Sequence, residues 1–215
     1  MGHLILIRHG VTSWNVSGRF QGHSDVPLSD EGRVQARALA GRLRDLGPFD
    51  AVYSSPLRRA HETATLALPE GAPEVRLEPR LKELHFGSFE GFTLAENQRH
   101  AAWDGWFDDP FGRATPQGES YQQLRDRAVD WLGSLDRSAT TLAFAHSGTI
   151  QMLLSHVIGV ERPSWRKRFF LRHTSLTHVV FEGEDAIVER VNDARHIEQP
   201  SVGLYGTRPT ESLSQ

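Results

Sequence analysis

The stretch LILIRHG, Leu4 to Gly10, places an arginine, a histidine and a glycine directly after a short apolar run. The run from His3 to Ile7 has the length and composition of a buried β-strand. Burying a guanidinium and an imidazole at the end of such a strand is unfavourable unless each group finds a partner. We therefore expect Arg8 and His9 to lie at an edge of a sheet, where a ligand can provide those partners.

Strand-like and helix-like segments alternate along the rest of the chain. Apolar spacing and capping residues predict helices over 29–46, from Pro56 onward, over 119–137 and over 148–158. Short apolar runs predict strands over 51–54, 75–77 and 141–145, and a hairpin that joins 176–181 to 186–191. This order predicts an α/β fold, namely a three-layer α/β/α sandwich with a mainly parallel mixed sheet.

The helix over 29–46 has the clearest start signal. Ser29 is expected to be its N-cap, because acidic residues follow it in the first turn and Gly47-Pro48 ends the pattern. The spacing predicts that one apolar face is buried, formed by Val34, Ala38, Leu39, Leu43 and Leu46.

Composition limits the class of protein. The 215 residues carry a formal net charge of −3, which gives neither nucleic acid nor an anionic membrane an electrostatic reason to bind. The chain has no cysteine, so disulfides and a cysteine nucleophile are excluded. The first apolar run is too short for a membrane span or a signal peptide, and we expect a cytoplasmic protein. The oligomeric state stays open.

The domain organisation is expected to be simple. We predict one domain over 1–198 and a polar, flexible C-terminal tail over 199–215. The segment 92–118 fits neither the helical nor the strand period well, and we interpret it as a small helical cap. Its aromatic residues either pack this cap onto the core or line the entrance of a site, and they are Trp103, Trp106, Phe107 and Phe111.

Two other predicted strands are also followed by polar or charged residues, as the first strand is by Arg8 and His9. TLAFA ends in His146-Ser147-Gly148, and the strand over 51–54 leads into SSPLRR, which puts Arg58 in the first turn of a helix. Ligands bind at the carboxyl ends of strands in open α/β sheets. Two arginines and a helix N-terminus together favour a phosphate group. Arg59, beside Arg58, is interpreted as a surface residue.

A series of motifs in collinear order over about residues 3–197 resembles the histidine phosphatase superfamily, which includes phosphoglycerate mutases. These motifs are LILIRHGVTSWN, RFQGHSDVPLSDEGRVQA, YSSPLRRAHETA, LKELHFGSFEG, PQGES, FAHSGTI, SLTHVVF and VNDARHI. The resemblance implies that His9 is the phosphorylated nucleophile and Glu83 the proton donor. It implies that Arg8, Arg58 and His146 bind the transferred phosphoryl group. By the same resemblance, Asn15 and the backbone of Gln21 and Gly22 are expected to line the phosphate pocket, and Ser147 and Gly148 are expected to contact the phosphate or the substrate.

The chemical properties of these residue types also fit this reaction, independently of the resemblance. A neutral imidazole attacks phosphorus well, and Arg8 and Arg58 are expected to lower the pKa of His9. Fixed cations stabilise the charge on the phosphoryl oxygens, and Glu83 protonates the leaving oxygen. The scheme needs no metal ion and no cofactor. The one His-Glu pair, His61-Glu62, has Thr65 where a zinc-binding HExxH motif has histidine.

Three functions remain open: a metal-independent phosphomonoesterase acting on a small phosphorylated metabolite, a phosphoglycerate mutase, and a non-catalytic phosphate- or phosphohistidine-binding module. The first is favoured over the third because nucleophile, acid and phosphate ligands are all present. It is favoured over the second because the only arginines in 92–118, Arg99 and Arg113, are outnumbered by Glu96, Asp104, Asp108 and Asp109. A mutase would need other cations in the pocket, such as Arg19 or the Arg166-Lys167-Arg168 run.

Overall fold

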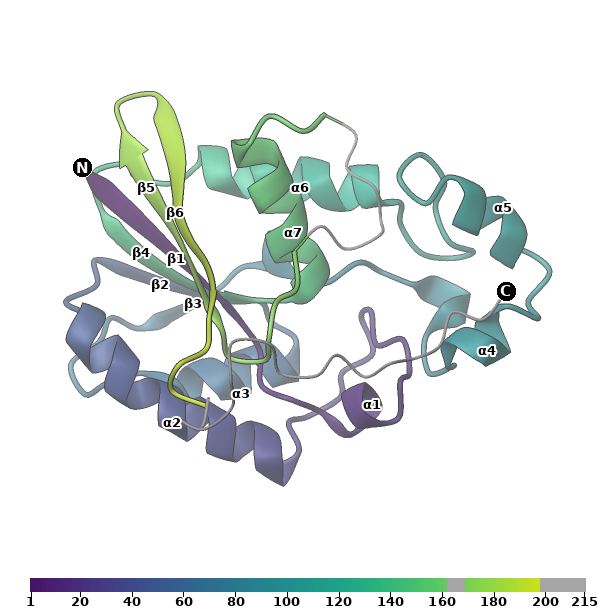
Figure 1. The fold of residues 1–215 in the computed structure, drawn as a ribbon, viewed down its shortest axis with the longest axis horizontal. Helices are drawn as coiled ribbons and strands as arrows, with labels where there is room; N and C mark the ends of the chain where they lie inside the picture. The colour runs from purple at the N-terminus through teal and green to yellow at the C-terminus, as the bar shows by residue number, and fades with distance from the viewer. Residues whose placement is uncertain (162–168, 198–215) are drawn as a thin grey trace.

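The computed structural model describes residues 1–161 and 169–197, and a six-stranded sheet of order β3-β2-β4-β1-β5-β6 forms its centre (Figure 1). The strands are β1 Gly2–Arg8, β2 Ala51–Ser54, β3 Val75–Leu77, β4 Thr140–Ala145, β5 Leu176–Glu182 and β6 Asp185–Asp193. The first four in that order are parallel, whereas β5 runs antiparallel to β1 and β6 antiparallel to β5. The expected α/β fold with a mainly parallel mixed sheet is confirmed. The tail over 199–215 and the run 166–168 lie outside the described residues.

Helices cover both faces of the sheet. One face carries α2 Asp30–Leu46 and α3 Arg58–Ala67, and the other carries α6 Tyr121–Gly133 and α7 Ser147–Val157 (Figure 1). β1 supplies side chains to both layers. Ile5 and Ile7 pack with the α2 and α3 side, and Leu4 and Leu6 with the α6 and α7 side. Because both of its faces are buried, β1 reads as an unbroken apolar run rather than an alternating one.

Helix α2 begins as predicted and buries Leu39 and Leu43 as expected, with Leu46 partly buried, but the rest of its buried face differs from the prediction. The Gly32 N–H donates to the Ser29 hydroxyl at 3.1 Å, so Ser29 is the N-cap. The buried residues are Gly32, Ala36, Leu39 and Leu43, whereas Val34 is 64% exposed and Ala38 is exposed too. The reason is close packing against the loop after β1, since a Cβ added to Gly32 would lie 2.1 Å from the Val11 carbonyl oxygen. The contact face is therefore centred on small residues.

Two other helices differ from the prediction at their ends. α6 stops at Gly133 rather than continuing to Arg137. α3 starts at Arg58 with Leu57 as its N-cap, two residues later than a helix that begins at Pro56. This later start determines the direction of the two arginines, because Arg58 is exposed and Arg59 is fully buried.

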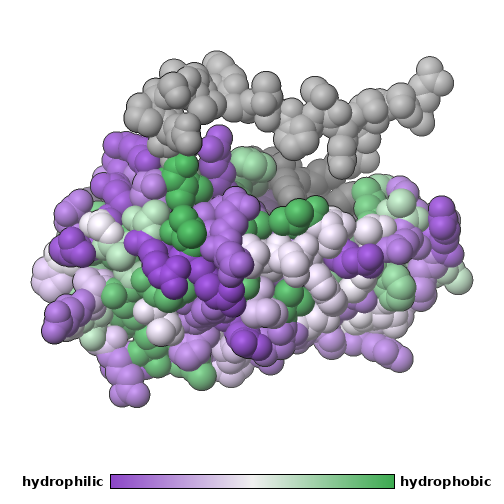
Figure 2. Space-filling view, turned by 90° about the horizontal axis from the view of Figure 1, so that it is seen from below, coloured by the Kyte–Doolittle hydropathy of each residue, from purple (hydrophilic) through white to green (hydrophobic). Residues whose placement is uncertain are grey.

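Short helices lie beyond the carboxyl ends of the parallel strands (Figure 1). They are α1 Ser13–Val16, η1 Pro79–Leu81, η2 Gly87–Phe89, α4 Leu94–Asn97 and α5 Trp103–Asp108. Trp103 and Trp106 of α5 are buried in one apolar cluster with Phe89. On the face shown in Figure 2, hydrophobic residues form separate small groups among hydrophilic ones.

Candidate active site

Three neighbouring strands end together and place polar residues at one edge of the sheet. His9 follows β1, Ser55 follows β2 and His146 follows β4. The His9 N–H donates to the Ala145 carbonyl at 3.0 Å, and the His146 Nε2 and Ser55 Oγ atoms form a 2.8 Å hydrogen bond. The ring centroids of His9 and His146 are 5.1 Å apart. Because β1 and β4 are neighbours in the sheet, the two histidines lie side by side.

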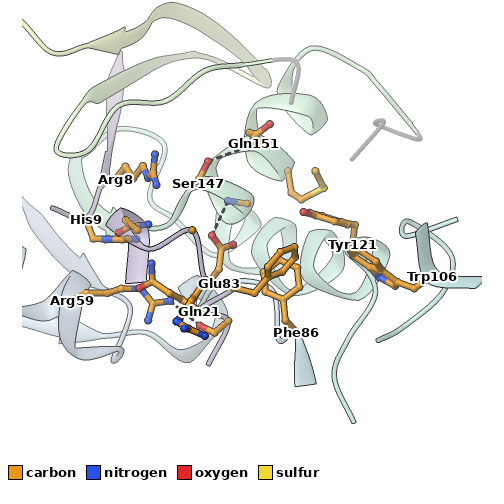
Figure 3. A pocket seen from close by; sticks show the side chains of 17 residues that line it. Arg8, His9, Gln21, Arg59, Glu83, Phe86, Trp106, Tyr121, Ser147 and Gln151 are labelled. Carbon is orange, nitrogen blue, oxygen red and sulfur yellow. Dashed lines mark hydrogen bonds between the residues drawn. The ribbon is translucent and has the colours of Figure 1, made fainter. Parts of the chain in front are cut away.

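A cavity of about 710 Å³ opens at this edge (Figure 3). The described residues that line it are Arg8, His9, Asn15, Gly18, Arg19, Phe20, Gln21, Gly22, Arg59, Glu83, Phe86, Trp106, Tyr121, Ser147, Gly148, Gln151 and Met152. Arg8, His9, Glu83 and all five predicted phosphate or substrate contacts are brought together here. His146 is fully buried beside His9 and does not form part of the wall.

His9 is held in one tautomer. Its Nδ1 atom donates to the Gly10 carbonyl at 2.7 Å, and a carbonyl can only accept. The proton therefore lies on Nδ1, and Nε2 keeps its lone pair. Burial, followed by the positive charge of Arg59, holds the pKa of His9 well below its ordinary value. At neutral pH the ring is therefore uncharged, and it lies in the wall of the cavity.

Arg8 and Arg59 flank His9 with unused hydrogen-bonding capacity. Arg8 donates to the Leu171 carbonyl at 2.5 Å, and Arg59 donates to the Gly22 and Ser24 carbonyls at 2.7 and 3.0 Å. The Nε atoms of both arginines are buried and have no partner among residues 1–161 and 169–197. Burial lowers the pKa of each to about 10, so both remain cationic at neutral pH. An anion in the cavity would satisfy both groups.

The structure corrects the assignment of Arg58. Its side chain is exposed and borders a shallow surface depression with His61, outside the cavity that contains His9. The Arg58 N–H donates to the Asp25 carboxylate at 2.7 Å, and its neighbour Arg59 points inward instead. The physical reason is the register of α3. With Leu57 as N-cap, Arg59 is the second helical residue and faces the sheet edge.

Glu83 is positioned by two backbone donors. The Leu84 N–H donates to Oε1 at 2.9 Å, and the Gly148 N–H at the start of α7 donates to Oε2 at 3.0 Å. Gly148 must be a glycine for this contact, because an added Cβ would lie 2.3 Å from Glu83 Oε1. His146, the N-cap of α7, starts the helix whose second residue is Gly148. The N-terminus of α7 therefore positions both His146, which is its N-cap, and the Glu83 carboxylate, which accepts from the Gly148 N–H.

Arg127 fixes the backbone that carries Glu83. Its guanidinium donates to the carbonyls of Arg80 and Lys82, both at 2.7 Å, and to that of Glu83 at 2.8 Å. The Glu119 carboxylate holds the same guanidinium at 2.5 and 3.1 Å. The segment before Glu83 thus has little freedom to move along the cavity.

The loop after β1 supplies amide groups to the cavity. The Thr12 N–H donates to Asn15 Oδ1 at 3.0 Å, and the Thr12 hydroxyl donates to Gln21 Oε1 at 3.0 Å. Both side-chain oxygens are used as acceptors, so each amide NH₂ is the end available to an anion. Gly22 has φ +50° and leaves no room for a side chain, because an added Cβ would lie 2.0 Å from Glu90 Oε1.

In addition to Arg59 and Arg127, sequence reasoning missed Glu90 and His173. Glu90 organises the loop, since it accepts from the N–H groups of His23 and Ser24, both at 2.8 Å. His173 donates from Nδ1 to the His9 carbonyl at 3.1 Å. His173 had a usable signal: it closely precedes β5, and an antiparallel neighbour of β1 begins at the edge where β1 ends. Glu90 carried no such signal, because His23 and Ser24, its partners in this loop, are far away in the chain.

Comparisons with known proteins identify the family of this chain. The family model of the histidine phosphatase superfamily, branch 1, matches residues 4–194. The relative named "Probable phosphoglycerate mutase GpmB" in Escherichia fergusonii is 32% identical over 94% of this chain and 98% of its own. The phosphoserine phosphatase of Entamoeba histolytica, solved with 3-phosphoglyceric acid, is 30% identical with a TM-score of 0.81, covering 92% of this chain and 100% of its own. The α-ribazole phosphatase of Shigella flexneri is 28% identical with a TM-score of 0.82, covering 89% and 96%. The chain belongs to the histidine phosphatase superfamily.

Two further observations concern the described part of the chain. No group of three or more histidine, cysteine, aspartate or glutamate side chains within it is arranged to hold a metal ion. None of its helices is long and apolar enough to cross a membrane.

Proposed function

We propose that this protein is a metal-independent phosphomonoesterase that hydrolyses a small phosphorylated metabolite through a phosphohistidine at His9. The observation that carries the proposal is the combination around His9. A neutral imidazole with its Nε2 lone pair available stands between Arg59, which is buried, and Arg8, which is partly buried, and the buried Nε atom of each arginine has no partner among the described residues. A tetrahedral phosphate supplies several oxygens to such donors at once.

In the first step, His9 Nε2 attacks phosphorus. A nitrogen–phosphorus bond forms, the ester phosphorus–oxygen bond breaks, and the leaving oxygen takes a proton from Glu83. Arg8 and Arg59 hold the phosphoryl oxygens, whose negative charge persists throughout the transfer. Glu83 and the bound phosphate compete for one proton, because two adjacent anions repel each other. The proton that passes to the leaving oxygen is therefore already present in the enzyme–substrate complex.

In the second step, a water molecule attacks the phosphohistidine. Glu83, now ionised, accepts a proton from this water, the nitrogen–phosphorus bond breaks, and inorganic phosphate leaves. His9 returns to its neutral form with the proton still on Nδ1, since the Gly10 carbonyl holds it there. Splitting the hydrolysis into two displacements lowers the barrier of each.

Hydrolysis is favoured over a mutase reaction by the charges around the cavity. A mutase must hold a second anionic group of its substrate away from His9. Arg99 and Arg113 of the 92–118 segment are absent from the described wall, and Trp106 is what that segment contributes. Arg19 does line the cavity, and this cation favours a mutase. Its guanidinium is already engaged by the Gly91 carbonyl at 2.6 Å and the Glu96 carboxylate at 3.5 Å.

The test follows two products from one substrate. We expect the protein, incubated in EDTA, to release inorganic phosphate from 3-phosphoglycerate and from a simple alkyl phosphate. With 3-phosphoglycerate it should form little 2-phosphoglycerate. Adding 2,3-bisphosphoglycerate should not change this ratio. Isomerisation that exceeds phosphate release by a large factor would establish the mutase instead. Absence of both reactions with every monoester would favour a binding module.

Glu83 as proton donor predicts a dependence on the leaving group. Glu83→Gln should lower kcat/KM for ethyl phosphate by about 10²- to 10⁴-fold, because an alkoxide leaves poorly without a proton. The loss for p-nitrophenyl phosphate should stay within about tenfold, since nitrophenolate needs little protonation. The measurement is kcat/KM of both proteins with both esters. Equal losses would assign Glu83 a structural role.

A further inference from the structure

We infer that this cavity selects monoesters with a single phosphate whose alcohol carries an aromatic ring or a comparably flat apolar group. The inference rests on the proposed function for the phosphate end of the cavity. It concerns the other end, where the leaving alcohol of the substrate would lie.

The two ends of the cavity differ in chemistry. Figure 3 shows Phe86, Tyr121 and Trp106 together on the side away from Arg8, His9 and Arg59, with Glu83 between the two groups. Phe20 and Met152 complete the apolar wall. An alcohol that receives its proton from Glu83 would therefore extend from the charged end toward these side chains.

The aromatic wall is fixed before any ligand binds. Phe86 meets Phe20 edge to face at 4.8 Å and Trp106 at 6.2 Å, and Trp106 packs on Trp103 at 5.3 Å. These rings belong to an internal apolar cluster that also includes Met152. Aromatic side chains lose little conformational entropy on binding a planar group when their rings are already held by neighbours. Such a surface favours a flat apolar body.

Charge excludes the main alternative, a compact substrate with anionic groups at both ends. Apart from Arg8, Arg59 and Glu83, the charged residue in the described wall is Arg19. The Arg19 guanidinium already lies 3.5 Å from the Glu96 carboxylate, so a second anionic group of the substrate would have to share this cation with Glu96. Burial raises the pKa of Tyr121, so its phenol stays neutral at the apolar end. A second phosphate or carboxylate placed there would lose its hydration without full compensation.

The volume of the cavity also favours a substrate with a large apolar group. The cavity volume of about 710 Å³ falls in the range typical of sites for drug-sized ligands, and a phosphate group with a two-carbon alcohol would leave most of it unfilled. Filling the remaining space with apolar atoms removes both their surface and that of the wall from water.

The experiment compares esters that need the same leaving-group chemistry. We expect kcat/KM for 2-phenylethyl phosphate to exceed that for ethyl phosphate by at least about tenfold, the gain typical of burying one aromatic side chain. 3-Phosphoglycerate should be no better than ethyl phosphate. In Phe86→Ala the ratio of phenylethyl to ethyl ester should fall about three- to tenfold. The matched control is Phe107→Ala, because Phe107 stacks on Trp103 at 5.5 Å and is not among the wall residues, so the ratio should not change.

A ratio near one in the unaltered protein, or a ratio that Phe86→Ala leaves unchanged, would overturn the inference. Failure of the proposed function looks different, since no ester would then release phosphate. Binding still decides the inference in that case. By titration calorimetry, 3-phenylpropylphosphonate should bind the unaltered protein at least about tenfold more tightly than propylphosphonate. Equal affinities would overturn the preference for an aromatic group independently of turnover and of any variant's folding.

Discussion

Replacing His9 with alanine is expected to reduce kcat/KM for every phosphomonoester by at least about 10⁴-fold, the order of loss typical of removing an enzyme's nucleophile. The reason is that no other neutral imidazole lines the described wall. His146 is fully buried beside His9, and His173 is tied to the His9 carbonyl. The measurement is steady-state phosphate release by the purified variant, accompanied by its circular dichroism spectrum and melting temperature.

The matched control for this variant is His61→Ala. His61 is an exposed histidine on α3, away from the cavity, so its loss should leave kcat/KM unchanged. A folded His9→Ala protein that retains activity within about tenfold of the unaltered enzyme would exclude His9 as the nucleophile.

Arg59→Ala is expected to reduce kcat/KM by about 10²- to 10³-fold or more, whereas Arg58→Ala should stay within about threefold of the unaltered protein. Arg59 is a buried cation beside His9 with an unused Nε donor among the described contacts, and Arg58 is exposed. Adjacent positions of one helix turn thus provide a matched pair. Since Arg59 also donates to the Gly22 and Ser24 carbonyls, Arg59→Lys is a second variant that keeps the charge.

Kinetics of the three variants with ethyl phosphate check this assignment. The lysine variant should recover part of the loss but not all of it, because an ammonium cannot reproduce two parallel donors. A large loss in Arg58→Ala together with a small one in Arg59→Ala would restore the assignment made from sequence alone. In that case the start of α3 would have to shift by one residue.

Arg58 and Arg59 show which features of this site the sequence predicts and which it does not. The strand ends at His9, Ser55 and His146 follow from apolar runs, and the parallel order brings them together as expected. The choice between Arg58 and Arg59 depends on where one helix begins. Pro56 is compatible with a first helical turn, yet the helix starts two residues later at Arg58. A shift of this size is within the ordinary uncertainty of helix ends and reverses which side chain is buried.

The rest of the site depends on contacts between distant segments. Arg127 reaches the backbone around Glu83 from α6, and Glu90 reaches the loop that carries Gly22. Nothing local to either residue distinguishes it from a solvated charge. The dual role of Trp106, which packs against Trp103 and also lines the cavity, is another example. Helical spacing predicts the packing, whereas the cavity exists only after six segments of the described chain have come together.

The most direct test of the account is to capture the intermediate. The unaltered protein is mixed with a fast substrate such as p-nitrophenyl phosphate, quenched within the first turnover by strong base, digested, and analysed by mass spectrometry. The account predicts one phosphoryl group on the peptide that contains His9, stable in base, lost in acid, and absent from His9→Ala. Phosphate release at the normal rate without phosphorylated His9, or with the phosphoryl group on another residue, would contradict it.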